Sequence, residues 1–262
     1  MNIKELKKSD IKKIERIIEL TYLSSFLKDK LPLSLMLISP PEQSKTYFLL
    51  SKTTKKSKVL TDLSWKGVLN ILGEKENQNL SHLVIPDLLK LTEKKASTKN
   101  NLLSLLNGFL EEGIFEIKVG NDKKIDFEGR SGGMITATTK KSYEQNRKNW
   151  EKMGLTSRFL KVSYRLSNGI IHNIMRKISK QKKQKQDPTL IEAKEKSIKV
   201  KKEHTEEIIN LSNHSIRKFQ NLSTLLEAIA LDHNREETID KDLEELKILL
   251  KYVNTNFKKI EK

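Results

Sequence analysis

The first two thirds of the chain alternate short apolar runs with amphipathic stretches. Residues 33–38 are almost continuously apolar, which is typical of a strand buried on both faces of a parallel sheet. Pro40-Pro41 ends this run, and a helix is expected over residues 45–51. A longer helix is expected over residues 3–28, where isoleucines recur at helical spacing and Ser9-Asp10 is a suitable cap.

The same alternation continues to about residue 168. Strands are expected at residues 59–63, 83–87 and 133–139, helices at 65–72 and 100–111, and a hairpin at 113–128 around the Gly-Asn-Asp of 120–122. Alternating strands and helices predict an α/β fold, in which a parallel sheet is flanked by helices.

The pattern changes after residue 168, where strand-like runs become rare. Leucines and isoleucines recur at helical spacing over residues 216–232 and again over 243–253. We therefore expect two domains, an α/β core at 1–168 and a small helical domain at 169–262. A basic connector at 176–202 belongs to the second domain.

Net charge adds a class of partner to this picture. The chain of 262 residues carries a formal charge of +17, and the connector is one of its most basic segments. A positive field of this size favours a polyanion such as DNA or RNA. The alternative is a solvated basic loop with no ligand.

Composition also excludes several classes. The chain has no cysteine and its five histidines are scattered, so we expect no structural zinc. No apolar run has the length of a membrane span, and the N-terminal residues do not resemble a signal peptide, so we expect a cytoplasmic protein without a membrane partner.

The loop between the apolar run 33–38 and the helix after it has the outline of a phosphate-binding loop. Lys45 and Thr46 stand where the Walker A pattern has Lys-Ser/Thr, whereas Ser39 and Ser44 replace its two glycines. Some 40 residues later the apolar run 83–87 ends in Asp87, as a Walker B strand does.

Five stations in this order resemble the AAA+ P-loop ATPases, in particular the branch of the minichromosome maintenance helicases and the MoxR-type ATPases. They are SPPEQSKT at residues 39–46, LVIPD at 83–87, MITATT at 134–139, GLTSRFL at 154–160 and SIRKFQNL at 215–222. The resemblance implies an AAA+ core followed by a helical lid, and ATP with Mg²⁺ as cofactors.

The resemblance also implies roles for single residues. Ser39, Ser44, Lys45 and Thr46 would form the nucleotide-binding loop, with Thr46 and Asp87 as the ligands of Mg²⁺. The sensor-1 residue would be Thr138, or else Thr136. Arg158 resembles an arginine finger acting on a neighbouring subunit, and Arg217 resembles the sensor-2 arginine of the lid.

One departure from the family pattern bears on activity. Leu88 follows Asp87, where an active member has the glutamate that polarises the attacking water. Losing such a base costs about 10²–10⁴ in rate. The leading hypothesis is therefore an ATP-binding subunit of an oligomeric assembly, made with itself or with related AAA+ subunits, that acts on DNA with weak or lost hydrolysis.

Two alternatives stay open. One is an adaptor that keeps the AAA+ fold, binds no nucleotide and bridges nucleic acid to a protein. The other is an active motor in which Glu93 supplies the missing base.

Contacts to the DNA backbone are expected from two groups of lysines. One group lies at the hairpin and the other in the connector: Lys118, Lys123, Lys124, Lys182, Lys183 and Lys185. Lysines at a hairpin tip are also explained by solubility alone.

Overall fold

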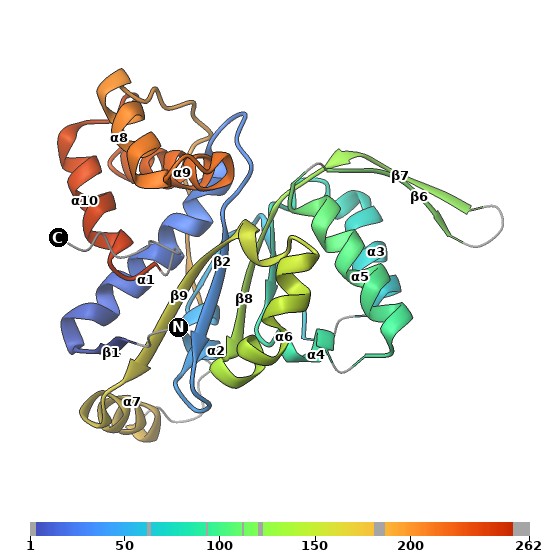
Figure 1. Ribbon diagram of the computed structural model, residues 1–262, viewed down its shortest axis with the longest axis horizontal. Coiled ribbons are helices and arrows are strands. Elements are labelled where there is room, and N and C mark those ends of the chain that lie inside the picture. The colour runs from blue at the N-terminus through green and yellow to red at the C-terminus, as the bar shows by residue number, and fades with distance from the viewer. Residues whose placement is uncertain are drawn as a thin grey trace.

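The fold is a parallel β-sheet with helices on both faces (Figure 1). It was obtained as a computed structural model, which describes residues 4–61, 64–92, 94–111, 113–119, 123–180 and 187–253. The expected α/β class with a parallel sheet and flanking helices is confirmed.

Five strands build the body of the sheet, and short β1 (Lys4–Leu6) extends it at one edge. The spatial order is β1-β9-β2-β8-β5-β4, and every neighbouring pair is parallel. The strands are β2 (Ser34–Ser39), β4 (Ser57–Val59), β5 (His82–Ile85), β8 (Gly133–Thr139) and β9 (Phe159–Leu166).

The strands that follow β2 in sequence are added first on one side of it and then on the other. From β2 the chain crosses to β4 and returns through β5 to β8, and it then passes over β2 to reach β9. Such a switch leaves a crevice at the carboxyl ends of the strands, where open α/β sheets bind their ligands. The loop at residues 40–44 follows β2 directly and lies at that edge.

Two hydrophobic clusters hold the helices to the two faces. Leu35 and Leu37 of β2 belong to one cluster, whereas Met36 and Ile38 belong to the other, and all four side chains are fully buried. Side chains alternate across a strand, so an unbroken apolar run is what a strand covered on both faces requires. Each of these side chains contributes about 1.5–3 kcal/mol through burial.

The first cluster joins the sheet to helices from both ends of the chain. They are α1 (Lys8–Leu23), α2 (Lys45–Leu50), α7 (Asn168–Lys180), α8 (Lys202–Ser212), α9 (Ile216–Asp232) and α10 (Asp240–Leu250). Arg16 of α1 pairs with Asp232 at 2.6 Å and with Glu245 of α10 at 2.8 Å. The expected domain division at residue 168 stays a prediction, and the C-terminal helices share one core with α1 and β2.

The second cluster is formed under the helices of the opposite face. They are α3 (Trp65–Gly73), α5 (Ala96–Phe109) and α6 (Lys140–Lys152), and short α4 (Leu89–Thr92) lies near them. Phe109 and Trp150 are fully buried here. The expected helices at 65–72 and 100–111 are therefore present, and the second begins four residues earlier than expected.

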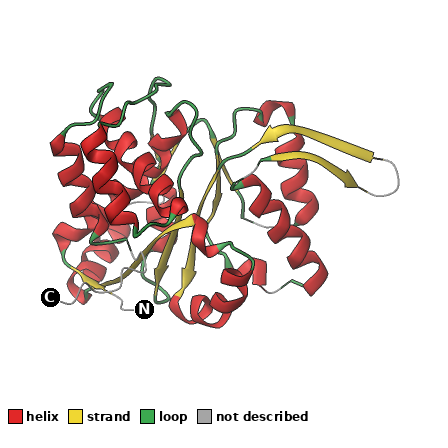
Figure 2. Ribbon diagram, turned by 45° about the horizontal axis from the view of Figure 1, so that its top comes forward, coloured by secondary structure: helices red, strands yellow, loops and turns green. Residues whose placement is uncertain are grey.

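A two-stranded hairpin projects from the body on the α5 side (Figure 2). It consists of β6 (Ile114–Val119) and β7 (Lys123–Arg130), which pair antiparallel. Ile114 and Phe127 bury its base against the second cluster. The hairpin expected at 113–128 is thus present, and its turn lies outside the described residues.

The segment after residue 186 returns along the body as extended chain. Its β10 (Thr189–Leu190) pairs with β3 (Lys52–Thr53), Lys196 bridges to Leu27, and Lys199 bridges to Glu237. No helix among the described residues is both long and apolar enough to cross a membrane.

The structure corrects three local expectations. The first long helix begins at Lys8, so Ser9-Asp10 lies inside its first turn, where Asp10 accepts the Lys7 N–H at 2.8 Å. The second strand ends at Val59 instead of beginning there. Sequence reading missed β9 altogether, although its apolar residues alternate from Leu160 to Leu166.

Candidate functional site

The loop after β2 has a strained backbone. Glu42 and Ser44 have φ of +58° and +57°, the left-handed region that glycine occupies without cost. For other residues this conformation costs about 1–2 kcal/mol each. Ser44, which replaces the second Walker A glycine, therefore keeps the backbone conformation that a glycine would favour, whereas Ser39 lies within β2.

Gln43 fastens this loop to the end of β9. Its side-chain oxygen accepts the backbone N–H of Leu166 at 2.6 Å, and its carbonyl accepts the hydroxyl of Tyr164 at 3.1 Å. Burial raises the pKa of Tyr164, so the hydroxyl keeps its proton and stays a donor. Sequence reading missed Gln43, because its partners lie more than 120 residues further along the chain.

Lys45 begins α2 and folds back over the loop. Its ammonium group donates to the carbonyl oxygens of Pro40 at 2.6 Å and Ser39 at 3.2 Å, and to the Ser39 hydroxyl at 3.3 Å. Burial lowers the pKa of Lys45, and the charge of Asp87 opposes that shift. The ammonium therefore lies in a site built for a cation, close enough to Asp87 to be influenced by its charge.

Asp87 follows β5 and is exposed, with one carboxylate oxygen accepting the Leu89 N–H at 2.9 Å. Thr46 is exposed on the first turn of α2. Leu88, in contrast, is fully buried and donates its N–H to Ala137 at 2.9 Å. A side chain in the position of the family's glutamate therefore points into the core.

Thr138 lies on β8 directly beside the end of β2, in register with Ile38. Its side chain is 1% exposed, and its hydroxyl has no hydrogen-bond partner among the described residues. Thr136, two residues earlier on the same strand, donates its hydroxyl to the backbone carbonyl of Ile85 at 2.7 Å. The structure thus gathers the loop, Asp87 and Thr138 at the carboxyl ends of the parallel strands, which we call the carboxyl edge of the sheet.

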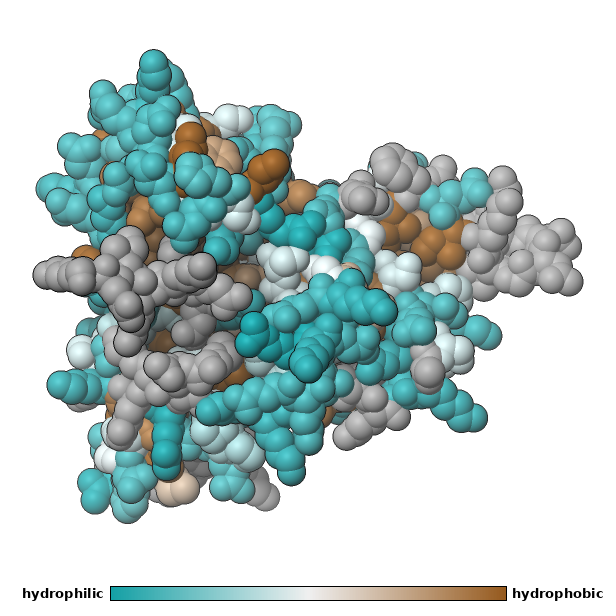
Figure 3. Space-filling model, viewed as in Figure 1, coloured by the Kyte–Doolittle hydropathy of each residue, from teal (hydrophilic) through white to brown (hydrophobic). Residues whose placement is uncertain are grey.

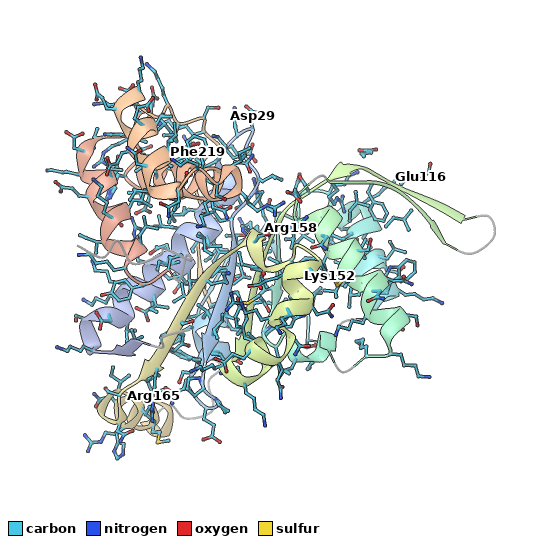
Figure 4. The ribbon with its side chains drawn as sticks, in the orientation of Figure 1. Asp29, Glu116, Lys152, Arg158, Arg165 and Phe219 are labelled. Atoms are coloured by element: carbon cyan, nitrogen blue, oxygen red, sulfur yellow. The ribbon has the colours of Figure 1, made fainter. Side chains whose placement is uncertain are left out.

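Arg158 and Arg217 lie at the amino ends of the strands, which we call the amino edge of the sheet. Arg158 precedes β9, whose first residue is in register with Ser34 at the start of β2. Six residues of β2 separate that end from the loop, roughly 17 Å. Figure 4 shows Arg158 and Arg165 at the two ends of β9. The two arginines are therefore near each other and remote from Lys45 of the same chain.

Glu111 brings these arginines together. It follows α5 and pairs with Arg158 and with Arg217, and Arg217 also donates to the Ser157 hydroxyl at 2.6 Å. Burial favours a raised pKa for Glu111, but hydrogen bonds and charge from both arginines outweigh it and hold that pKa below its ordinary value. Sequence reading missed Glu111, since no local pattern connects it to partners 47 and 106 residues away.

The predicted nucleic-acid lysines are only partly covered by the structure. Lys118, Lys123 and Lys124 lie on the outer part of the hairpin, where Lys118 is in register with Lys124. The connector lysines Lys182, Lys183 and Lys185 lie outside the described residues.

The residues of the loop and of the strand ends around it bear on whether a metal ion can bind. The described residues contain no group of three or more histidines and carboxylates that would hold an ion. A nucleotide-bound Mg²⁺ does not need one, because it uses one or two carboxylates together with phosphate oxygens and water. Asp87 and Thr46, exposed at one edge of the sheet, fit that requirement.

Comparison with known proteins adds no family assignment. No protein-family model matches this chain, and no curated protein sequence matches it.

Proposed function

We propose that this chain is an AAA+ type protein that binds ATP with Mg²⁺ at residues 39–46, acts on or with DNA in an oligomeric assembly, and hydrolyses ATP weakly or not at all. Lys45 would contact the phosphates, and Thr46 and Asp87 would hold the metal, which neutralises phosphate charge when bound. The chain's own groups bind and orient the nucleotide.

The observation that supports this most is that Lys45 and Asp87 lie at the same carboxyl edge of the sheet, within reach of each other's charge. They follow β2 and β5, two parallel strands whose carboxyl ends lie on the same side of the sheet with β8 between them, and the charge of Asp87 acts on the Lys45 ammonium. The Lys45 ammonium already binds three oxygens of Ser39 and Pro40. A phosphate must displace these contacts, so we expect a moderate affinity for ATP.

Weak hydrolysis is supported by Leu88. Its side chain is apolar and fully buried, so the position presents no carboxylate to a bound nucleotide. Arg158 lies at the far edge of the sheet from Lys45, which supports a finger role towards the nucleotide of a neighbouring subunit and not towards that of its own chain.

The test is equilibrium binding of labelled ATP with Mg²⁺ to the wild-type protein and to Lys45→Ala, at matched salt and without DNA. We expect the affinity to fall at least about tenfold, because a charge-assisted contact to phosphate is lost. Lys241→Ala is the matched control, since it removes the same charge from an exposed position of α10. Equal affinity in Lys45→Ala and Lys241→Ala would overturn the proposal.

One observation favours a second function, an adaptor that binds no nucleotide. Lys45 already has three oxygen partners within its own loop, so its charge is satisfied without phosphate. No binding of Mg-ATP by either protein, together with oligonucleotide binding by the wild type, would select the adaptor.

A further inference from the structure

A groove runs along the amino edge of the sheet, on the side opposite the loop. Three pockets of about 660, 340 and 370 Å³ adjoin there. The first and third pockets share Lys30 and Pro32 in their lining, and the second and third share Arg217 and Asn221. In Figure 3 the surface dips between the C-terminal helices and the base of the hairpin, where hydrophilic side chains predominate.

Cationic groups line this groove along its length. Eight lysines and arginines face the three pockets, against five acidic residues. Lys28 lies exposed at the wide end, and the half-buried Lys218 lies at the other. Side-chain amides accompany them, including Asn79 and Asn221, which supply donors and acceptors suited to phosphates and base edges.

The centre of the groove holds two arginines on one carboxylate. Arg158, Arg217 and Glu111 all line the same pocket, as do Asp29 and Phe219, which Figure 4 labels in the same part of the molecule as Arg158. Arg158 also donates to the Gly154 carbonyl, and Arg217 to the Ser157 hydroxyl. Glu111 is the carboxylate that pairs with both guanidinium groups. The cluster therefore keeps one net positive charge inside a recess, and Glu111 occupies the place where an external anion would bind.

The hairpin continues the groove outward. Phe127, Glu128 and Arg130 at its base line the largest pocket, and Lys118, Lys123 and Lys124 follow further along the same two strands. A chain of phosphates leaving the groove would thus pass along a ribbon that carries more lysines.

The depth of the groove favours a single strand over a double helix as its ligand. The Arg158 side chain is only 13% exposed, so a rigid double helix resting on the rims would not reach it. A single strand is flexible enough to enter pockets of a few hundred Å³, and proteins bind single strands through positively charged grooves that follow the backbone.

We propose that single-stranded nucleic acid binds along this amino-edge groove, with its phosphates on Arg158 and Arg217, and that Glu111 is an internal competitor for those arginines. The proposal rests on the nucleic-acid part of the proposed function and assigns it a surface other than the connector.

The test is fluorescence anisotropy of a labelled 20-nucleotide oligo-dT against the whole protein at several salt concentrations. Arg217→Ala should weaken binding about three- to tenfold and flatten the salt slope by about 0.7, as expected when one phosphate contact to a single strand is lost. Lys28→Ala, at an exposed position, tests the groove's wide end independently of the cluster and should act in the same direction.

Glu111→Gln provides the sharper readout, because it should strengthen binding by about threefold or more as both arginines are released to the phosphates. Glu207→Gln is its control. Glu207 pairs with Lys247 on α8 and α10, its side chain is 38% exposed against 32% for Glu111, and the net charge changes equally. The proposal requires a gain for Glu111→Gln that Glu207→Gln does not give.

Several results would overturn it. They are equal affinities for all the variants, tighter binding of a 20-base-pair duplex than of oligo-dT, and binding of inorganic phosphate alone at the cluster with no oligonucleotide bound. Wild-type protein that binds Mg-ATP but no oligonucleotide would also overturn it, while leaving the nucleotide proposal standing.

Discussion

The two edges of this one sheet are organised by different interactions. At the carboxyl edge, most hydrogen bonds go to backbone groups. The Ser39 and Pro40 carbonyls accept from Lys45, and the Gln43 side chain accepts from the main chain of β9. At the amino edge, charged side chains meet from three distant segments around Glu111. A motif read along the sequence finds the first kind of site, whereas only the fold reveals the second.

The difference also divides the residues to which the AAA+ resemblance assigns roles at a nucleotide, with Arg158 acting on that of a neighbouring subunit. Lys45, Asp87 and Thr138 lie at the carboxyl edge, and Arg158 and Arg217 lie at the other. Within one chain the two arginines therefore lie away from Lys45 and line the groove proposed for single-stranded nucleic acid.

The largest expected effect is a loss of stability in acid, caused by a buried histidine at the amino edge. His82 opens β5 there, is fully buried, and bonds through Nε2 to the Leu33 carbonyl at 3.0 Å. Burial lowers its pKa from 6.5 to about 4. The unfolded chain takes up the proton first as pH falls, so the stability due to neutral His82 is complete above pH 6.5 and is lost towards pH 4, by about 3 kcal/mol.

Urea unfolding at pH 7.5, 5.5 and 4.5 measures this loss. His82→Gln keeps a donor for Leu33 and should show a smaller fall in stability over that range, whereas His172→Gln, at an exposed position of α7, should behave as the wild type does. The same acid dependence in all three proteins would contradict the assignment.

The fastening of the loop should give the next largest effect. Gln43→Ala leaves the Leu166 N–H without its acceptor in a buried place, which costs about 1–3 kcal/mol. Thermal unfolding measures the change, and Gln145→Ala on the exposed face of α6 is the control. A shift no larger than that of the control would mean that the loop is not held through this bond.

Relief of backbone strain should act in the opposite direction. Ser44→Gly places glycine at φ +57° and should stabilise the protein by up to about 1 kcal/mol. The melting temperature measures it. Lower stability would show that the Ser44 side chain contributes more than its backbone costs.

The charge cluster should contribute least to stability. Glu111 and Arg217 are each about one-third exposed, so solvent screens their pairing, and Glu111→Gln should cost less than about 1 kcal/mol. Urea unfolding at low and high salt tests this. A larger loss that salt abolishes would make the cluster a structural element and weaken the case for a ligand.

Local pattern predicted much of the fold. The strand at 133–139 and the helix at 216–232 have the expected bounds, because each is a long run with one clear periodicity. β9 was missed because its first two residues, Phe159 and Leu160, were assigned to the GLTSRFL motif, and the alternation that follows them was not read as a strand.

The candidate sites divide in the same way. The carboxyl edge follows from a strand, a loop and a helix that are adjacent in sequence, so Lys45 and Asp87 were within reach of prediction. Glu111 was not, because its role depends on where α5, β9 and α9 end in space.

The packing of α1 has a consequence for the order of events at the ribosome. Ile14, Ile17 and Ile18 are buried in a cluster with Leu225 and Leu226 of α9, which is synthesised about 200 residues later. At roughly 5–20 residues per second, α1 waits about 10–40 s before its partner helix emerges. During that interval its apolar stripe is a natural binding site for a chaperone, and the rate of translation sets how long that exposure lasts.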